Sequence, residues 1–176
     1  AASANFNKEI WSWSNDLSLA FGGIKYLDES EVFMYQKTDD KIDLSSMVGI
    51  RVSKNYLISL NAGFKTQFAD GFTYPNDSVA VSKFMAPGYM NLALGTDYVK
   101  DANFSIFGSP FATKTTFVMD DSLSQIGSFG LDKGEHIRYE FGAFVKLKWN
   151  AELMKNIDMK SKIELFSNYL NNPQNI

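Results

Sequence analysis

The chain has 176 residues, a length typical of a single domain. Its formal net charge of −3 argues against a nucleic-acid-binding protein, because such proteins are usually basic. The mean hydropathy is slightly negative, and no run of about 18 apolar residues occurs, so the sequence excludes a transmembrane helix. Aromatic residues make up 15% of the chain, and cysteine is absent. This composition is natural for a membrane β-barrel, although the lack of cysteine is only compatible with an envelope protein.

The predicted elements are strands joined by connections that alternate between short and long. In chain order, strands are expected over residues 2–7, 10–23, 41–52, 56–68, 85–98, from about 104, 135–150 and 157–169. Short connections are expected near residues 8–9, 53–55, 100–103 and 150–156, and long ones near 24–40, 69–84 and 110–134. Outer-membrane barrels have short periplasmic turns and longer extracellular loops. The alternation therefore predicts that the short turns face the periplasm.

The clearest strand covers residues 56–68. Its even positions are mostly apolar and its odd positions mostly polar, from Tyr56 at one end to Phe68 at the other. Side chains of a strand point alternately to opposite faces, so this segment has one apolar and one polar face. Its length also suits a membrane-crossing strand of about 9–11 residues. A soluble lipocalin-like barrel is the alternative, with the apolar face turned inward.

The two chain ends suggest that the barrel extends beyond these residues. With the short turns in the periplasm, the first and last predicted strands would both end on the extracellular side. The tail from Asn171 to Ile176 is loop-like and lacks a closing strand. We therefore expect one antiparallel transmembrane β-barrel domain over residues 1–176. About eight strands would be visible, as an inner portion of a longer chain with ten or more strands.

The polar face of each strand predicts a charged lumen. The candidate lumen residues are Asp43, Arg51, Lys65, Gln67, Asp97, Arg138, Glu140, Lys146, Lys148, Asp158, Lys160, Lys162 and Glu164. With Asp16, which has the same predicted orientation, the inward face carries seven basic and six acidic residues, so the charges nearly cancel. One interpretation is therefore a paired network that holds the barrel rigid. The other is a charged path or ligand site, although an ion-selective pore would more naturally show one dominant sign.

No catalytic, cofactor or metal site can be read from the sequence. His136 is the only histidine and has no nucleophile motif beside it, so a structural or exposed role is expected. Asp39, Asp40 and Asp43 do not match the spacing of a calcium loop. Turn capping and ion pairing with Lys37 and Lys41 fit these acidic residues better, and the pair Asp120-Asp121 has the same interpretation.

Several motifs in fixed order resemble one known family. They are Lys37–Ile42, Phe64–Phe68, Ser82–Tyr89, Leu94–Tyr98, Phe104–Pro110 and Glu164–Tyr169. The chain is similar, over most of residues 10–172, to an uncharacterised domain-of-unknown-function family of Bacteroidota envelope proteins, regarded as outer-membrane barrels. The family brings no established activity or catalytic residue, and its full members are longer at both ends. The resemblance also implies that residues 37–41, Lys65 and Gln67 lie together near the extracellular rim as a plug or gate.

Three functions remain open at this point. The first is an accessory or scaffold subunit of a larger envelope complex for secretion, barrel assembly or uptake, located in the outer membrane. Its partners would be outer-membrane lipid and other outer-membrane or periplasmic proteins, with no nucleic acid and no cofactor. The second is a porin-like barrel that transports small solutes or lipids. The third is a surface hydrolase that uses His136, although no enzyme is readable from the residues.

Overall fold

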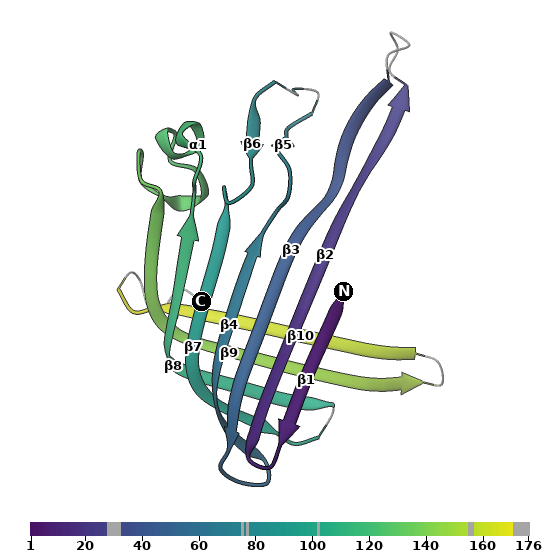
Figure 1. Ribbon diagram of the computed structural model, residues 1–176, viewed down its shortest axis with the longest axis vertical. Coiled ribbons are helices and arrows are strands. Elements are labelled where there is room, and N and C mark those ends of the chain that lie inside the picture. The colour runs from purple at the N-terminus through teal and green to yellow at the C-terminus, as the bar shows by residue number, and fades with distance from the viewer. Residues whose placement is uncertain (28–32, 75, 77, 102, 155–156, 171–176) are drawn as a thin grey trace.

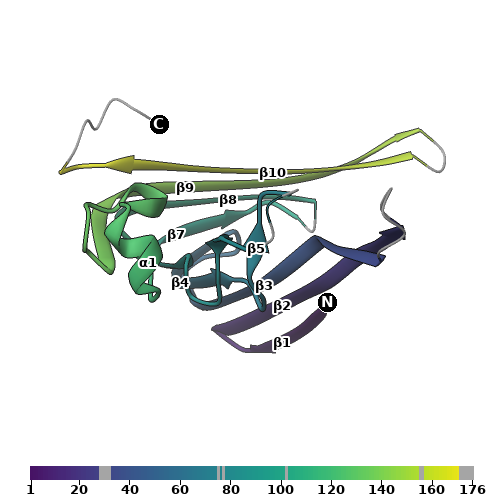
Figure 2. The ribbon, with the colours of Figure 1, turned by 90° about the horizontal axis from the view of Figure 1, so that it is seen from above.

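The computed structural model describes residues 1–27, 33–74, 76, 78–101, 103–154 and 157–170. Over these residues, eight antiparallel strands form one sheet in the order β1-β2-β3-β4-β7-β8-β9-β10, so the predicted all-β antiparallel fold is confirmed. The sheet curls into a half-barrel with β1 and β10 at its edges (Figures 1 and 2). The strands are β1 (Ala2–Lys8), β2 (Trp11–Leu27), β3 (Phe33–Arg51), β4 (Tyr56–Thr66), β7 (Gly88–Val99), β8 (Phe104–Phe117), β9 (Ile137–Met154) and β10 (Ile157–Asn168). The loop-like tail predicted over residues 171–176 lies outside the described residues.

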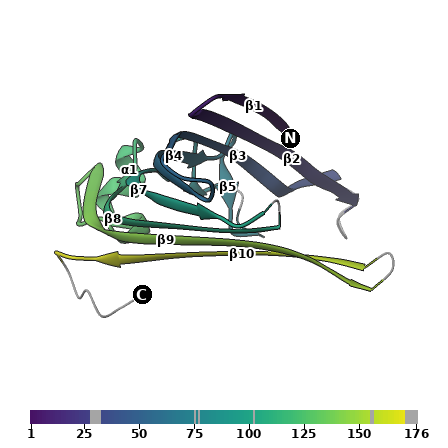
Figure 3. The same cartoon turned by 90° about the horizontal axis from the view of Figure 1, so that it is seen from below.

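Strands that follow one another in the sequence also lie side by side in this sheet, as in a meander. The turns after β1, β3 and β7 are short and the connections after β4 and β8 are long, as predicted at these five places. The view from below shows the sheet wrapping from β1 round to β10 (Figure 3). The curl gives the sheet one concave and one convex face.

The strand β4 shows how the sequence pattern becomes these two faces. Its odd-numbered residues from 57 to 61 point into the concave face and are buried, whereas its even-numbered residues from 56 to 60 are about half exposed. The same division continues across the sheet through the strand register. One row of cross-strand partners on the convex face is apolar and exposed throughout: Phe6, Trp13, Val48, Leu60, Leu94 and Phe111.

The long connection expected over residues 24–40 is instead mostly strand. β2 continues to Leu27 and β3 already begins at Phe33, so the two strands extend as a hairpin beyond the neighbouring strand β4 (Figure 1). A bulge at Gly22/Gly23 shifts the register and lets the pairing continue. The prediction was wrong here because charged residues suggest a loop locally, whereas a paired strand satisfies its backbone groups whatever side chains it carries.

The strand β8 also runs further than expected, through Pro110 to Phe117. Proline cannot donate a ladder hydrogen bond, so it occurs in sheets at edges and bulges. Here the register between β8 and β9 shifts between Ser109 and Ala112, and Pro110 lies at that shift. The expected loop over 110–134 therefore begins only after residue 117.

Two long connections fold into small substructures at one end of the sheet. Between β4 and β7, the short strands β5 (Gly71–Phe72) and β6 (Ala80–Ser82) form a separate two-stranded sheet. Between β8 and β9 lie the helix α1 (Asp121–Gln125) and the 3₁₀ turn η1 (Ser128–Gly130). Within the described residues, no helix is both long and apolar enough to span a bilayer.

The bulge between β7 and β8 generates the first prediction. A Cβ atom at Gly95 would collide with the backbone of Gly108, whereas a Cβ atom at Gly108 would meet nothing within 4 Å. Gly95→Ala should therefore lower the free energy of unfolding by about 1–3 kcal/mol, because two backbones cannot move apart without breaking the ladder. Gly108→Ala, the matched control, should change it by less than about 0.5 kcal/mol. Equilibrium unfolding in urea measures both, and equal effects would contradict the close approach.

Candidate functional site

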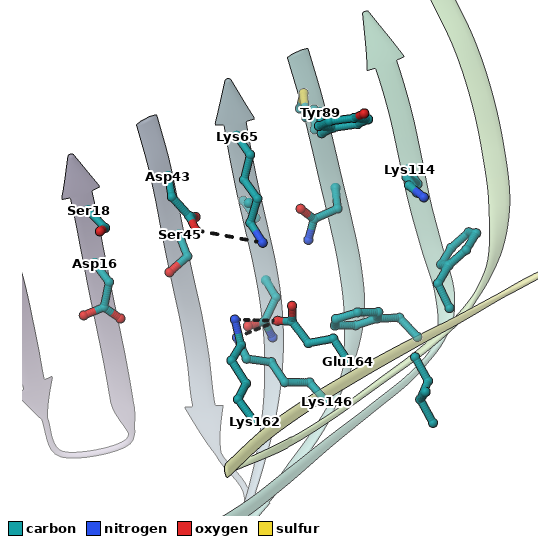
Figure 4. A pocket seen from close by; sticks show the side chains of 18 of the residues that line it. Asp16, Ser18, Asp43, Ser45, Lys65, Tyr89, Lys114, Lys146, Lys162 and Glu164 are labelled. Atoms are coloured by element: carbon teal, nitrogen blue, oxygen red, sulfur yellow. Dashed lines mark ion pairs between the residues drawn. The ribbon is translucent and has the colours of Figure 1, made fainter. Parts of the chain in front are cut away.

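The concave face of the sheet holds an open cavity of about 630 Å³. Strands on both sides of the half-barrel contribute to it, and their side chains point toward a common space (Figure 4). Its charged lining, among the described residues, consists of five lysines and three carboxylates: Lys65, Lys114, Lys146, Lys148, Lys162, Asp16, Asp43 and Glu164. The cavity is therefore locally basic, although the whole chain has a net charge of −3.

Two carboxylates in this region are each shared by two lysines. Glu164 Oε1 lies 2.9 Å from Lys162 Nζ and 3.8 Å from Lys146 Nζ (Figure 4). Asp43 Oδ2 lies 3.2 Å from Lys41 Nζ and 3.9 Å from Lys65 Nζ. These side chains are partly exposed, so each pair contributes at most about 1 kcal/mol. The pairs position the charges more than they stabilise the fold.

Aromatic side chains line the cavity beside its charged residues. Phe144 of β9 and Phe166 of β10 are direct cross-strand partners, and both line the cavity. They pack against a buried cluster of Ala93, Phe107 and Ala112. The ammonium of Lys114 lies 5.9 Å from the centre of the Phe166 ring, within the range of a cation–π contact. The cavity thus combines cations with aromatic surface.

The structure separates the predicted lumen residues into three groups along the sheet. The middle group lines the cavity and consists of Asp43, Lys65, Lys146, Lys148, Lys162 and Glu164. A second group lies toward the long-loop end: Gln67, Arg138 and Glu140. A third lies toward the short-turn end: Arg51, Asp97, Asp158 and Lys160. Only the middle group is brought together around one space.

In the second group, Arg138 and Glu140 tie β9 to its surroundings. Arg138 Nη2 donates to Glu140 Oε2 at 2.9 Å, and Asn168 Nδ2 of β10 donates to Glu140 Oε1 at 3.1 Å. Arg138 Nη1 also donates to the Gly130 carbonyl at 2.7 Å, which attaches η1 to the sheet. This part of the predicted network has a structural geometry.

The third group does not line the cavity. Asp97 is buried and accepts a hydrogen bond from Ser59 Oγ of the neighbouring strand. Arg51 donates to the Lys54 carbonyl at 3.3 Å within the β3–β4 turn. Asp158 and Lys160 are exposed near the start of β10.

Lys114 is the main cavity residue that the sequence did not indicate. The expected loop from Pro110 onward ended the alternation too early, so the inward positions of β8 were not assigned. The run from Thr113 to Phe117 is rich in β-branched residues, which favour strands. With this composition taken into account, the predicted strand would have continued past Pro110, and Lys114 would have been assigned to the concave face.

At the long-loop end, Lys37, Asp40 and Gln67 line a second, smaller cavity of about 240 Å³. Lys37 Nζ lies 2.8 Å from Asp40 Oδ2 and also donates to the Ala69 carbonyl at 2.8 Å. Asp40 accepts hydrogen bonds from the backbone amides of Phe68 and Ala69, so its predicted capping and ion pairing are confirmed. Lys65, expected to join this group, points into the main cavity instead.

No metal centre emerges from the acidic motifs. Among the described residues, no group of three or more histidine, cysteine, aspartate or glutamate side chains gathers in a way that could hold an ion. Asp40 and Asp43 are each within 4 Å of a lysine ammonium. What this region can do chemically is pair charges and bind charged solutes.

The two long connections contact each other in what we call the rim cluster, residues 83–86 and 118–131. Ala86, Val118, Leu123 and Leu131 form its buried apolar centre. At its edge, Lys83 Nζ lies 2.6 Å from Asp120 Oδ2. Asp120 is also the N-cap of α1, where its side chain accepts from the Leu123 amide. One carboxylate therefore caps the helix and joins the two loops.

This arrangement shifts the pKa values of both partners. Hydrogen bonds from Lys83 and Ser122 favour the ionised carboxylate, and they hold the pKa of Asp120 well below its usual range. The same contact raises the pKa of the Lys83 ammonium. Both groups are therefore charged at neutral pH.

His136 lies beside the rim cluster. Its Nδ1 is 2.8 Å from the Val118 carbonyl, and because a carbonyl only accepts, this nitrogen carries the proton. Its Nε2 is 3.6 Å from Asp121 Oδ1. Neither contact is with a serine, threonine or cysteine side chain that the histidine could activate, so this geometry gives the hydrolase hypothesis no further support.

One family model matches the N-terminal part of the chain. Residues 1–72 match a family model described as a protein of unknown function (DUF3078). Two of the motifs noted in the sequence, 37–42 and 64–68, lie in the matched segment, whereas the other four lie beyond it. The match covers β1 to β5, and the cavity lysines of β8, β9 and β10 lie outside it.

The other two comparisons give no match. No curated protein is significantly similar to this chain. No solved structure is significantly similar to it either.

The rim cluster generates the second prediction. Asp120→Ala removes the N-cap of α1 and the contact with Lys83, so the opening free energy of residues 118–131 should fall by about 1 kcal/mol at pH 7. Asp132→Ala, an exposed carboxylate in the same connection, serves as the control and should change it little. Amide hydrogen exchange of this segment measures both, and equal effects would argue against the cap.

A third prediction concerns the pH dependence of the same contact. Because the folded-state pKa of Asp120 is lowered, its contribution is fully present above the unfolded-state pKa near 4. It is lost as the pH falls below that value and through the folded-state pKa. The difference in hydrogen exchange between the wild type and Asp120→Ala should therefore shrink under acidic conditions. A difference that stayed constant down to strongly acidic pH would contradict this assignment.

Proposed function

We propose that this chain forms part of a β-barrel in a bacterial outer membrane and serves there as an accessory or scaffold subunit of an envelope complex. Three features of the sheet support the membrane location: the exposed apolar convex face, the strand length and the placement of the aromatic residues. The role as a scaffold is supported by the ion-paired concave face. Outer-membrane lipid would be the first partner of the convex face.

The convex face supports the proposal most directly. The row from Phe6 to Phe111 crosses six strands without a polar side chain, and each member is at least 37% exposed. Monomeric soluble proteins rarely expose a contiguous apolar surface of this kind. A hydrocarbon environment would cover it without further packing.

The strand lengths suit a bilayer. β4 has 11 residues, which at about 3.3 Å per residue corresponds to roughly 35 Å of strand. At the tilt of about 35–45° found in membrane barrels, it would cover roughly 25–30 Å along the membrane normal. That is the height of the apolar band of such barrels.

Aromatic residues lie at both ends of this band. Toward the short turns, the rings of Tyr56 and Tyr98 lie 5.1 Å apart, and Trp11, Trp13 and Trp149 are exposed. Toward the long loops, Phe21 pairs with Phe68 at 6.3 Å, and Phe141 pairs with Tyr169 at 5.8 Å. Two aromatic belts of this kind are typical of membrane–water interfaces.

The scaffold role is supported by the salt bridges and hydrogen bonds that the charged residues of the concave face form. Salt bridges hold Lys65, Lys146 and Lys162 beside carboxylates, and Arg138 and Glu140 connect two strands and a loop. The long connections are also tied to one another through Lys83 and Asp120. These contacts support a rigid barrel that presents fixed loops to a partner.

A second candidate function is the passage of small solutes, and one observation favours it. The concave face keeps an open cavity of about 630 Å³ beside its ion pairs. Space of this size can hold a small molecule. A completed barrel that retained this space would provide a path for solutes.

The fourth prediction tests the membrane location. Leu60→Arg places a charge on the convex face, and if this face meets lipid near the middle of the bilayer it should cost about 2–4 kcal/mol. Ser18→Arg places the same charge beside Asp16 and Asp43 in the open cavity, and should cost less than about 1 kcal/mol. Reversible folding into phosphatidylcholine vesicles measures both variants. Equal costs, or a larger cost for Ser18→Arg, would mean that the convex face does not meet lipid.

The choice between scaffold and transport needs a different experiment. The full-length protein would be extracted gently from its native membrane, and the mass of the native particle compared with that of the chain. A particle with a stoichiometric partner and no conductance in planar bilayers would support the scaffold role. A lone barrel with stable single-channel conductance would overturn it in favour of transport.

A further inference from the structure

The pairing of β9 with β10 places like charges opposite one another. Lys148 and Lys162 are direct cross-strand partners, and Lys146 is the partner of Glu164 in the next inward position. Like charges that face each other across a sheet are destabilising. Lys146, Lys148 and Lys162 also line the same cavity, so three ammonium groups gather on one face of these two strands.

The nearby carboxylates do not fully offset these cations. Glu164 contacts both Lys146 and Lys162, so one acidic group serves two lysines. Asp97 is buried, accepts a hydrogen bond from Ser59 and does not line the cavity. Lys148 lines the cavity with no carboxylate within 4 Å among the described residues. The Lys148 ammonium is therefore available to bind an anion from solution.

Lys114 is a second cavity lysine that forms no ion pair among the described residues. Lys114 lies across the β8–β9 ladder from Glu140, but that carboxylate already accepts hydrogen bonds from Arg138 and Asn168. The Lys114 ammonium instead lies over the ring of Phe166. Phe144 and Phe166 thus line the same cavity as the ammonium groups, and one of these lies over the Phe166 ring.

We propose that the cavity is a binding site for a small organic anion, with its carboxylate or phosphate group among Lys146, Lys148 and Lys162 and its apolar part against Phe144 and Phe166. The cavity volume of about 630 Å³ lies within the range of small-molecule sites. An anion here relieves the repulsion between facing lysines. The site rests on the cavity alone and goes beyond the proposed scaffold role.

The test uses the full chain in micelles of an uncharged detergent, with its lysines labelled as ¹³C-dimethyllysine, which keeps their charge. Phenyl phosphate and benzoate are the probes, inorganic phosphate lacks the apolar part, and phenyltrimethylammonium is the matched cation. The resonances of Lys146, Lys148 and Lys162 should shift with both aromatic anions at lower concentrations than with inorganic phosphate. They should not respond to the cation. Absence of a saturable shift with either aromatic anion would overturn the proposal.

Variants assign the effect to these lysines. Lys148→Gln should weaken binding of phenyl phosphate about tenfold, since it removes a charged hydrogen-bond donor. Lys148→Arg should retain binding, and Lys100→Gln, in the exposed β7–β8 turn, should not alter it. Without an anion, Lys148→Gln should be at least as stable as the wild type, because it removes a like-charge pair.

These readouts separate binding from a purely structural role. A Lys148→Gln chain that unfolds more easily without an anion would overturn the proposal, as would unchanged affinity for phenyl phosphate. Because the experiment is done in micelles without a partner, its failure would leave the scaffold role standing. A failure of the scaffold role would equally leave this site in place.

Discussion

The register of the antiparallel ladder is the constraint on which the rest of this structure depends. Because side chains alternate between the two faces, a slip of one residue in any strand would exchange its apolar and polar faces. The observed register keeps the row from Phe6 to Phe111 apolar across six strands. It also collects the lysines and carboxylates on the concave side. Both the convex surface and the cavity are consequences of this single alignment.

Bulges allow that register to continue where the sequence would otherwise interrupt it. The shift at Gly22/Gly23 extends the β2–β3 hairpin, and the shifts on either side of β8 accommodate Pro110 and the close approach of Gly95 to Gly108. The bends they introduce help the sheet to curl. The curl in turn brings residues of β9 and β10 and residues of β2 to β4 to the same open cavity (Figure 4).

The charged side chains of the concave face make different contacts at different positions along the strands. At the long-loop end, Arg138 is committed to hydrogen bonds with Glu140 and Gly130 that fasten strands and a loop. In the middle, lysines outnumber the carboxylates and leave cationic groups facing open space. The excess of lysines over carboxylates around the cavity is small in number, but it is confined to one open space. Position, more than total charge, separates the structural ion pairs from the lysines that line the cavity.

The sequence by itself determined the all-β class, the lengths of most connections and the face of most strand residues, because a period of two is a local property of a strand. It did not determine where β2, β3 and β8 end, since loop-forming residues such as Pro110 are tolerated when a partner strand and a bulge are available. Only the tertiary structure placed Lys114 near Phe166, and Lys148 opposite Lys162. Such contacts depend on the pairing and curl of distant strands, which no local pattern specifies.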